Sequence, residues 1–387
     1  MQQSINKMVQ NIEISGIRKF FNLVADETNV VSLTIGQPDF HTPQHIKNAA
    51  LNALMQNKTT YTHNAGIIDL RKAISVFNES HYSIRYNPEN EIIVTTGASQ
   101  AIDISFRTIL NPNDEVILPG PIYPGYEPLI TMAGAKAVHA DTTKDNFKLT
   151  KENLIQHLTD KTKCVVLPYP SNPTGASFTK DELVELVSVL KNRDIFILAD
   201  EIYSELVYDH PHVSIASFPE IRDKTIVING LSKSHAMTGF RIGYVLAPKW
   251  LTAHMLKVHQ YNVSCASSVS QYAALEALTN GQTDSAVMCE EYRKRRDYVY
   301  ERLIKMGLNV NKPEGAFYFF PKFPIKNMTS FELGIQLVRK GKVALVPGDS
   351  FSKLGEGYMR LSYAYDLNTL KKGLDHIEDF LQSYNFM

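Results

Sequence analysis

The chain has 387 residues, which corresponds to two or three domains at about 150 residues each and allows a large buried core. Its 40 lysine and arginine residues balance its 40 aspartate and glutamate residues, so the composition carries no charge signature for nucleic acid or an anionic membrane. Three widely spaced cysteines form neither a disulfide framework nor a zinc pattern, and no apolar run has the length of a signal peptide or a membrane span, so we expect a soluble, cytoplasmic protein that binds small molecules.

The first 45 residues predict an arm that joins a smaller domain. Residues 14–24 are amphipathic and predict a short helix packed on another part of the chain. Residues 31–39 predict a short strand that ends in a Gly/Pro turn. The absence of a side chain at Gly36 lets backbone approach a ligand closely, although the turn alone indicates no function.

From residue 92 onward, apolar runs alternate with segments of helical period. The runs are residues 92–96, 116–118, 164–167, 195–199 and 225–228. This alternation predicts a mostly parallel sheet covered by helices on both faces. In one connecting helix, Thr179 and Glu182 have the spacing of a capping box. Because ligands bind beyond the carboxyl ends of such strands, the residues after each run are candidate site residues.

The turn after the first run has the features of a phosphate site. Ala98, Ser99 and Gln100 open a helical segment directly behind a strand. A helix N-terminus offers free N–H groups and the positive end of the helix dipole, and both attract a phosphate. The chain contains neither the Gly-x-Gly-x-x-Gly nor the Walker A pattern, so neither a dinucleotide nor ATP is indicated.

Aromatic, amide and carboxylate side chains follow the next three runs. Tyr123 lies in a Pro/Gly-rich turn, Asn172 opens the sequence Asn-Pro-Thr-Gly, and Asp200 ends a hydrophobic run shortly before Tyr203. Each turn alone could be purely structural, and an aspartate in this position could cap a helix. A carboxylate at the end of a buried strand is costly unless a cation lies beside it, so Asp200 predicts a cationic partner.

Lys233 follows the last run in a small, polar segment that also contains Ser232. A lysine beside walls of low polarity loses proton affinity and becomes an amine nucleophile, as condensation with an aldehyde requires. Ser232 and Arg241 offer a hydroxyl and a planar set of donors to a phosphate. A single lysine in such a loop is more often a surface residue, but these three side chains together predict a pyridoxal phosphate pocket.

Beyond residue 283 the pattern changes to an α+β arrangement. A long charged helix is expected over residues 284–306, ended by a glycine. Short strands are expected over residues 316–320, 343–346 and 358–361, followed by a helix from about residue 368 to residue 384. Arg360 lies in the last strand, where an arginine is usually a solvated charge. Its guanidinium can also bind a carboxylate through two hydrogen bonds.

The sequence around these residues resembles the class I and II aminotransferases, the fold-type I enzymes that use pyridoxal phosphate. The resemblance covers essentially the whole chain, with the motifs in order. It includes Gly-Gln-Pro-Asp at residues 36–39, Tyr61 with Gly66, Leu70 and Arg71, Asn-Pro-Thr-Gly at 172–175, Asp-Glu-Ile-Tyr at 200–203, Ser-Lys at 232–233, Met-Thr-Gly-Phe-Arg-Ile-Gly-Tyr at 237–244 and Met-Arg-Leu-Ser at 359–362.

The resemblance implies catalytic, cofactor-binding and substrate-binding residues, and no metal. The catalytic residues are Lys233, which holds the cofactor and moves a proton, Asp200, which keeps the cofactor ring electron-withdrawing, and Tyr203, which donates to the phenolate oxygen. The implied cofactor-binding residues are Ala98, Ser99, Gln100, Tyr123, Asn172, Asp200, Tyr203, Ser232, Lys233, Arg241 and Tyr61. The implied substrate-binding residues are Gly36, Asn172 and Arg360, the last for the α-carboxylate.

Tyr61 would reach the phosphate site of a partner subunit, which implies a homodimer with shared active sites, although alone it could be a core or rim tyrosine.

The implied fold is α/β, with a large domain that binds pyridoxal phosphate and a smaller α+β domain. The large domain, residues 46–283, would contain a mostly parallel seven-stranded sheet between helices. Residues 1–45 would form an N-terminal arm and part of the smaller domain. Residues 284–387 would form the connecting helix and the rest of the smaller domain.

The implied activity is transfer of an amino group between glutamate or 2-oxoglutarate and a second amino or keto acid. Residues 14–19, 32–40 and 262–267 lie outside the cofactor motifs and resemble the bacterial N-acetyl-LL-diaminopimelate aminotransferases of lysine biosynthesis. Aromatic or aspartate aminotransfer is the alternative, and a pyridoxal-phosphate-dependent C–S lyase could use the same residues. A non-catalytic regulator is disfavoured because no basic DNA-binding segment precedes residue 30. The residue for a second substrate carboxylate stays open, with Arg18 as a candidate.

Overall fold

The computed structural model describes residues 4–324 and 327–383. Its largest sheet has the strand order β2-β8-β7-β6-β5-β3-β4. These strands are β2 (Ile92–Thr95), β3 (Glu115–Gly120), β4 (Lys136–Asp141), β5 (Thr162–Leu167), β6 (Phe196–Asp200), β7 (Thr225–Gly230) and β8 (Gly243–Leu246). Neighbouring strands run parallel except that β8 is antiparallel to both β2 and β7. The predicted seven-stranded, mostly parallel sheet is therefore confirmed.

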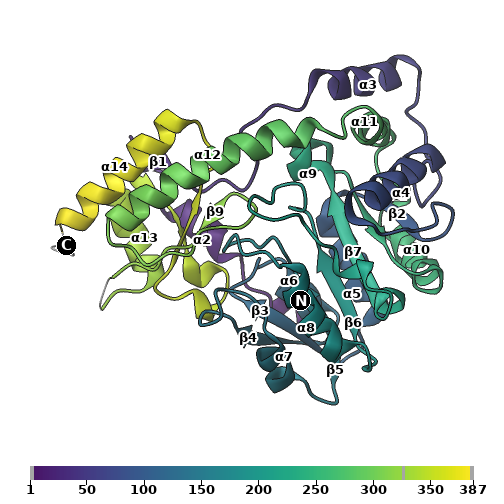
Figure 1. Ribbon diagram of the computed structural model, residues 1–387, viewed down its shortest axis with the longest axis horizontal. Coiled ribbons are helices and arrows are strands. Elements are labelled where there is room, and N and C mark those ends of the chain that lie inside the picture. The colour runs from purple at the N-terminus through teal and green to yellow at the C-terminus, as the bar shows by residue number, and fades with distance from the viewer. Residues whose placement is uncertain (1–3, 325–326, 384–387) are drawn as a thin grey trace.

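Both faces of this sheet are buried. Val165 and Leu167 of β5 belong to one hydrophobic cluster, whereas Cys164 and Val166 belong to another. Successive side chains of a strand point to opposite faces, so the two clusters lie on the two sides of the sheet. Helices pack around it (Figure 1): α4 (Ile68–Tyr82), α5 (Gly97–Ile109), α6 (Tyr126–Met132), α7 (Lys151–His157), α8 (Lys180–Leu190), α10 (Lys249–Val263) and α11 (Ser268–Thr279), while α3 (Gln44–Met55) packs on α11 at the periphery. Burial on both faces explains why the central strands read as continuous apolar runs.

The capping box predicted before α8 is present. The side chain of Thr179 accepts a hydrogen bond from the backbone N–H of Glu182, and the Glu182 carboxylate accepts from the backbone N–H of Thr179 at 2.8 Å. The helix then buries Leu183, Leu186, Val187 and Leu190. Local capping and a buried apolar face thus agree over the whole element.

A second core lies beside the large sheet and is crossed by the long helix α12 (Asp284–Lys305) (Figure 1). Its sheets are the antiparallel β11 (Val346–Pro347), β12 (Met359–Ser362) and β9 (Tyr318–Phe319), and the parallel pair β1 (Val31–Ser32) and β10 (Val343–Ala344). Its other helices are α13 (Ser330–Arg339) and α14 (Leu367–Ser383). Tyr384, the expected end of the last helix, lies outside the described residues. Leu33 and Tyr203 join this core from distant parts of the chain.

The N-terminal arm lies across elements of both cores. Helix α1 (Lys7–Gln10) lies against α6, and α2 (Gly16–Leu23) lies against β11 and α13. Phe20 of α2 is fully buried, which confirms the predicted amphipathic helix. The remaining short helices are α9 (Leu231–Ser234), η2 (Ile215–Ser217), η3 (Arg222–Lys224), η4 (Thr238–Phe240), η5 (Gly348–Ser350) and η6 (Lys353–Gly355). No helix in the described part of the chain is long and apolar enough to cross a membrane.

Candidate active site

Charged side chains from separate elements gather around Lys233. Asp200 comes from the end of β6, Arg241 follows η4, and Arg360 comes from β12 of the smaller sheet. All three affect the proton affinity of the lysine. The carboxyl ends of the parallel strands therefore meet the smaller sheet at one place, as expected for a ligand site in an open α/β sheet.

Lys233 lies in the single turn of α9, directly after β7. Its Nζ donates a hydrogen bond to the carbonyl oxygen of Gly36 and lies 5.7 Å from the ring centroids of Tyr203 and Phe317. Burial and the nearby cations Arg360 and Arg241 lower the pKa of the amine to about 8, against the opposing effect of Asp200. A lysine with this pKa supplies an unprotonated amine near neutral pH.

Asp200 is buried at the end of β6. Its Oδ2 accepts a hydrogen bond from the Tyr126 hydroxyl at 2.6 Å, and its Oδ1 accepts from the backbone N–H of Ile202 at 3.3 Å. Burial raises the pKa of the carboxyl to about 6, and the charge of Glu201 acts in the same direction. Two hydrogen bonds and Lys233 only partly offset the burial, so a cation bound against Asp200 would be stabilised.

Arg360 is 4% exposed and forms no ion pair with a carboxylate of the described residues. Its Nη1 donates to Asn172 Oδ1 at 2.9 Å, and its Nη2 donates to the carbonyl oxygen of Thr34 at 2.7 Å. Its Nε has no hydrogen-bond partner. Burial lowers the pKa of the guanidinium, but an arginine stays charged at physiological pH. A buried cation without a carboxylate is suited to bind the carboxylate of a substrate.

The turn before α5 is the place where the sequence predicts phosphate binding. Gly97 has a φ of 75°, and a Cβ built on it would lie 2.6 Å from Nη2 of Arg241, so the guanidinium lies directly on this turn. No side chain caps the N-terminus of α5. Ser99 is exposed beside it, and a hydrogen bond from Ser99 opposes the rise that burial causes in the pKa of Tyr123. A helix N-terminus with an adjacent guanidinium is a suitable anion site.

Two other residues of the expected phosphate group have different surroundings. The side chain of Gln100 accepts from the backbone N–H of Thr96 at 2.6 Å and contacts His259 Nδ1 at 3.1 Å, so its amide is held inside the protein. Only the backbone of Gln100 can face a phosphate at this helix end. Ser232 is buried next to Lys233.

The loop that carries Asn172 is held by the backbone and the Glu314 side chain of the segment before β9. The carbonyl oxygen of Gly175 accepts from the backbone N–H groups of Glu314 and Gly315 at 2.8 and 2.9 Å. The Glu314 carboxylate accepts from the backbone N–H of Ser177 at 2.8 Å and from Lys148 Nζ at 2.9 Å. The loop is therefore fixed from outside the sheet.

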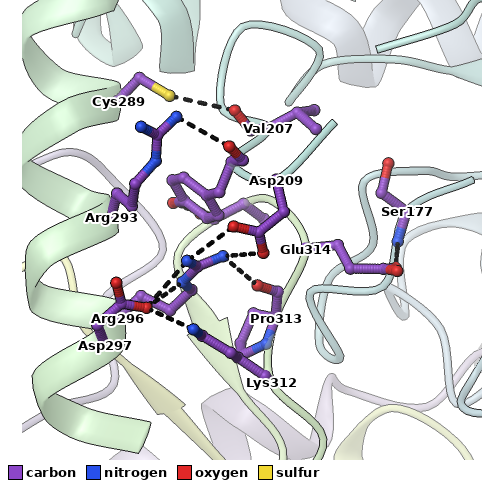
Figure 2. A network of polar contacts seen from close by, with 12 residues as sticks. Ser177, Val207, Asp209, Cys289, Arg293, Arg296, Asp297, Lys312, Pro313 and Glu314 are labelled. Carbon is purple, nitrogen blue, oxygen red and sulfur yellow. Dashed lines mark hydrogen bonds and ion pairs between the residues drawn. The ribbon is translucent and has the colours of Figure 1, made fainter. Parts of the chain in front are cut away.

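This support continues to α12, as Figure 2 shows. Arg296, only 1% exposed in its side chain, donates from Nη1 to Asp209 Oδ2 at 2.6 Å and to the carbonyl oxygen of Pro313 at 3.1 Å. Asp297 binds Lys312 at 2.9 Å. A long rigid helix thus holds the segment that in turn holds the Asn172 loop.

Tyr61 and Arg18 lie outside this cluster. Tyr61 is 87% exposed, and Arg18 is exposed on α2. Gly36, in contrast, is at the site because its carbonyl oxygen accepts from Lys233 and because a Cβ on it would lie 3.0 Å from the Tyr318 hydroxyl.

Sequence reasoning did not identify Tyr126 or Tyr318 as site residues. Tyr126 bonds to Asp200, and the Tyr318 hydroxyl lies 2.8 Å from that of Tyr203. The only signal for Tyr126 was its place in the aromatic turn that carries Tyr123. Tyr318 belongs to a run of apolar residues, in which a site tyrosine and a core tyrosine have the same pattern.

A comparison with protein families decides the class of this chain. The sequence model described as aminotransferase class I and II matches residues 28–377. The chain belongs to the class I and II aminotransferases. It is therefore an aminotransferase that depends on pyridoxal phosphate and acts on amino and keto acids.

Individual relatives agree with this class. The chain is 59% identical to the probable N-acetyl-LL-diaminopimelate aminotransferase of Bacillus subtilis strain 168, over 98% of this chain and 96% of that protein. It is 40% identical to an aspartate aminotransferase of Pyrococcus abyssi, over 95% and 96% of the two chains. The crystal structure of an aromatic aminotransferase from Pyrococcus horikoshii superposes with a TM-score of 0.90 at 38% identity, covering 96% of this chain and all of the other. The fold-type I architecture is thereby confirmed.

The residues of this aminotransferase fit pyridoxal phosphate in three ways. Lys233 has an amine of lowered pKa that can condense with the cofactor aldehyde. Asp200 has a buried carboxyl of raised pKa, and a cationic ring nitrogen beside it would stabilise its charged form. The uncapped end of α5 with Arg241 offers donors to a phosphate. The described residues contain no group of three or more His, Cys, Asp or Glu side chains placed to hold a metal ion.

Proposed function

We propose that this aminotransferase moves an amino group between glutamate and the N-acetylated keto acid that corresponds to N-acetyl-LL-diaminopimelate, a reaction of lysine biosynthesis. The observation that carries the proposal is the 59% identity, over almost the full length of both chains, to the relative named for this substrate. The identity is 40% with a relative named for aspartate and 38% with a relative named for aromatic amino acids. The difference favours the N-acetylated substrate.

The site residues act together on the substrate α-amino acid. Arg360 binds its α-carboxylate, and Asn172 and Thr34 hold the guanidinium in the orientation for that contact. Gly36 has no side chain, so its backbone can approach the bound substrate closely. Lys233 Nζ removes the proton from the substrate Cα, because its lowered pKa makes the free amine available.

The cofactor is held by the same residues. Bound pyridoxal phosphate supplies an electron-withdrawing ring that accepts the negative charge developing at the substrate Cα. Asp200 would keep the ring nitrogen protonated, Tyr203 and Asn172 would donate to the phenolate oxygen, and Tyr123 would pack on the ring. The backbone of residues 98–100, together with Ser99, Ser232 and Arg241, would hold the phosphate.

The second carboxylate of glutamate requires a donor from elsewhere. Arg18 remains our candidate because α2 lies against η5 and β11, the elements next to the strand that carries Arg360. Closure of the arm over the substrate would bring its guanidinium nearer. The same movement would cover the longer side chain of the N-acetylated substrate.

We also propose a cytoplasmic homodimer. Tyr61 is 87% exposed, and the apolar residues Leu51, Leu54 and Met55 of α3 are exposed as well. A second subunit packed here would bury these side chains and would let Tyr61 contribute to the partner's phosphate site. The domain boundaries at residues 45 and 283 are part of the same proposal. They are supported by the second hydrophobic core, which consists mainly of residues beyond 283, with Leu33, Tyr203, Leu206 and Tyr208 added from earlier in the chain.

The test is the ratio of kcat/KM for two amino acceptors, with glutamate as the donor. We expect N-acetyl-2-amino-6-oxopimelate to exceed phenylpyruvate. A preference for phenylpyruvate of more than about tenfold, which is about 1.4 kcal/mol of transition-state binding, would overturn the substrate in favour of an aromatic one. Release of pyruvate from cystathionine without any keto acid would instead indicate a C–S lyase.

A further inference from the structure

Tyr318 contacts several of the residues to which the proposed function gives a role. It is fully buried in β9. Its hydroxyl lies 2.8 Å from the hydroxyl of Tyr203, and its ring centroid lies 4.5 Å from the guanidinium carbon of Arg360. The same hydroxyl would be 3.0 Å from a Cβ on Gly36. One side chain thus connects the cofactor-binding and the substrate-binding parts of the site.

We propose that Tyr318 is a positioning residue with two separable roles. Its hydroxyl donates to Tyr203 and so directs the Tyr203 proton into the site, and its ring holds Arg360 in the orientation that binds the α-carboxylate. This inference rests on the proposed function only through the roles of Tyr203 and Arg360. It does not depend on which keto acid is the second substrate.

The role of the hydroxyl follows from the number of protons available. Each tyrosine hydroxyl has a single proton to donate, and burial raises the pKa of both Tyr203 and Tyr318, so both stay protonated. If Tyr203 donates to the cofactor oxygen, the bond between the two hydroxyls must be donated by Tyr318. Consecutive hydrogen bonds polarise one another, so Tyr318 makes Tyr203 a stronger donor.

The role of the ring follows from the surroundings of Arg360. The guanidinium has two hydrogen-bond acceptors, Asn172 and Thr34, and two aromatic neighbours, Tyr318 at 4.5 Å and Phe351 at 5.0 Å. A cation over an aromatic face is attracted to it. The adjacent strands β9 and β12 pair Tyr318 with Ser362, so the ring and the guanidinium share one small sheet.

The hydroxyl is tested with Tyr318→Phe, which removes one oxygen and keeps the ring. The readout is the pH at which the absorbance of the bound cofactor changes in the holoenzyme. We expect the midpoint to rise by about 0.7 pH unit, equivalent to the loss of a hydrogen bond of about 1 kcal/mol at about 1.4 kcal/mol per unit. The KM for glutamate should stay within about twofold of wild type. A midpoint that does not move would overturn the role of the hydroxyl.

Tyr363→Phe is the matched control. Tyr363 is also fully buried, and its hydroxyl lies 3.2 Å from another tyrosine hydroxyl, that of Tyr208. It contacts neither Tyr203 nor Arg360 in the described structure, so its removal should leave the midpoint unchanged. In Tyr203→Phe protein, adding Tyr318→Phe should give no further shift, because the effect passes through Tyr203. A further shift of the same size would contradict that route.

The ring is tested with Tyr318→Leu, which leaves a buried apolar residue but no aromatic face. We expect the KM for glutamate to rise at least about fivefold with a smaller change in kcat. An unchanged KM would overturn the role of the ring, and Tyr318→Phe remains decisive for the hydroxyl if the leucine variant does not fold. Failure of the proposed function would appear in the unmodified enzyme, as missing turnover with the N-acetylated keto acid. Failure of this inference would appear only in the variants: the Tyr318 variants would have the same cofactor midpoint and the same KM for glutamate as the wild-type enzyme.

Discussion

Arg360 donates a hydrogen bond to Asn172 at 2.9 Å, although 188 positions separate the two residues in the sequence. Asn172 lies on the loop that follows β5 of the large sheet, and Arg360 lies in β12 of the smaller one. The residue proposed for the substrate carboxylate is therefore oriented by a loop from the other core. Disturbance of either side should be visible in substrate binding.

Replacement of the guanidinium should weaken binding of the amino donor. In Arg360→Lys, a single ammonium cannot reproduce the planar set of donors that reaches Asn172, Thr34 and a carboxylate. We expect the KM for glutamate to rise about tenfold or more, with a smaller fall in kcat, in initial-rate measurements. Arg339→Lys is the control, because Arg339 is exposed and its ion-pair partner among the described residues is Glu27 at 3.2 Å. Equal KM values for the two variants would contradict the assignment.

Loss of the Glu314 side chain, which holds the Asn172 loop, should also weaken binding of glutamate. Glu314→Ala leaves the Ser177 N–H without its acceptor and removes one carboxylate partner from Lys148. We expect the free energy of unfolding to fall by about 1–3 kcal/mol and the KM for glutamate to rise.

The Glu314 series has an internal comparison. Glu314→Gln retains an oxygen that can accept from Ser177, so it should recover most of the KM. Glu185→Ala removes an exposed ion pair with Lys151 and should change neither quantity. A glutamine variant as impaired as the alanine variant would show that charge, and not the hydrogen bond to the loop, is what matters.

The buried Asp200 should make the apoprotein less stable as the pH rises. Its pKa is raised to about 6 in the folded protein, from an ordinary value of 3.8. The stability that this group contributes is therefore present below about pH 4 and is lost as the pH rises through 6. Compared with wild type, Asp200→Asn apoprotein should gain stability between pH 5 and 7, approaching about 3 kcal/mol, while the holoenzyme loses activity.

Thermal or denaturant unfolding at several pH values measures this gain. Asp297 should affect stability with the opposite pH dependence, because Lys312 and Arg296 lower the pKa of its carboxyl. Asp297→Asn should therefore lose stability relative to wild type as the pH rises. A stability difference for Asp200→Asn that is independent of pH would be inconsistent with a raised pKa.

Shared active sites predict complementation between two inactive proteins. Lys233→Ala lacks the amine, and Tyr61→Ala lacks the side chain proposed to reach the partner's site. Mixed under conditions of subunit exchange, they should form hybrid dimers in which one site has both residues, and activity should return in part. If exchange is demonstrated by mass and no activity returns, the contribution of Tyr61 across the interface is wrong.

The sequence predicted the central strands because burial on both faces leaves a continuous apolar run. It did not predict β4 or β8. Strand β4 lies at the edge of the sheet with half-exposed residues, so its apolar pattern is weak. Strand β8 has only four residues and begins within the motif that contains Arg241. That motif indicates cofactor binding, and a strand of four residues has too short a pattern to be recognised beside it. The expected strand over residues 343–346 is in fact β10 and β11, which belong to different sheets.

The positions of most candidate site residues could be predicted from the sequence because parallel strands bring their carboxyl ends to one edge. Asp200 and Lys233 follow neighbouring strands, so strand order alone places them near each other. The partners that orient them depend on tertiary packing. Nothing local distinguishes Tyr126 or Tyr318 from core tyrosines, and nothing local shows that the Gln100 side chain turns inward to His259.

We propose Lys233 as the amine that carries the cofactor. Reduction of the holoenzyme with borohydride, followed by digestion and mass spectrometry, locates the lysine bound to pyridoxal phosphate. The account predicts the added mass on the peptide that contains Lys233, and neither added mass nor turnover in Lys233→Ala. The cofactor on a peptide with another lysine, together with undiminished turnover in Lys233→Ala, would contradict it.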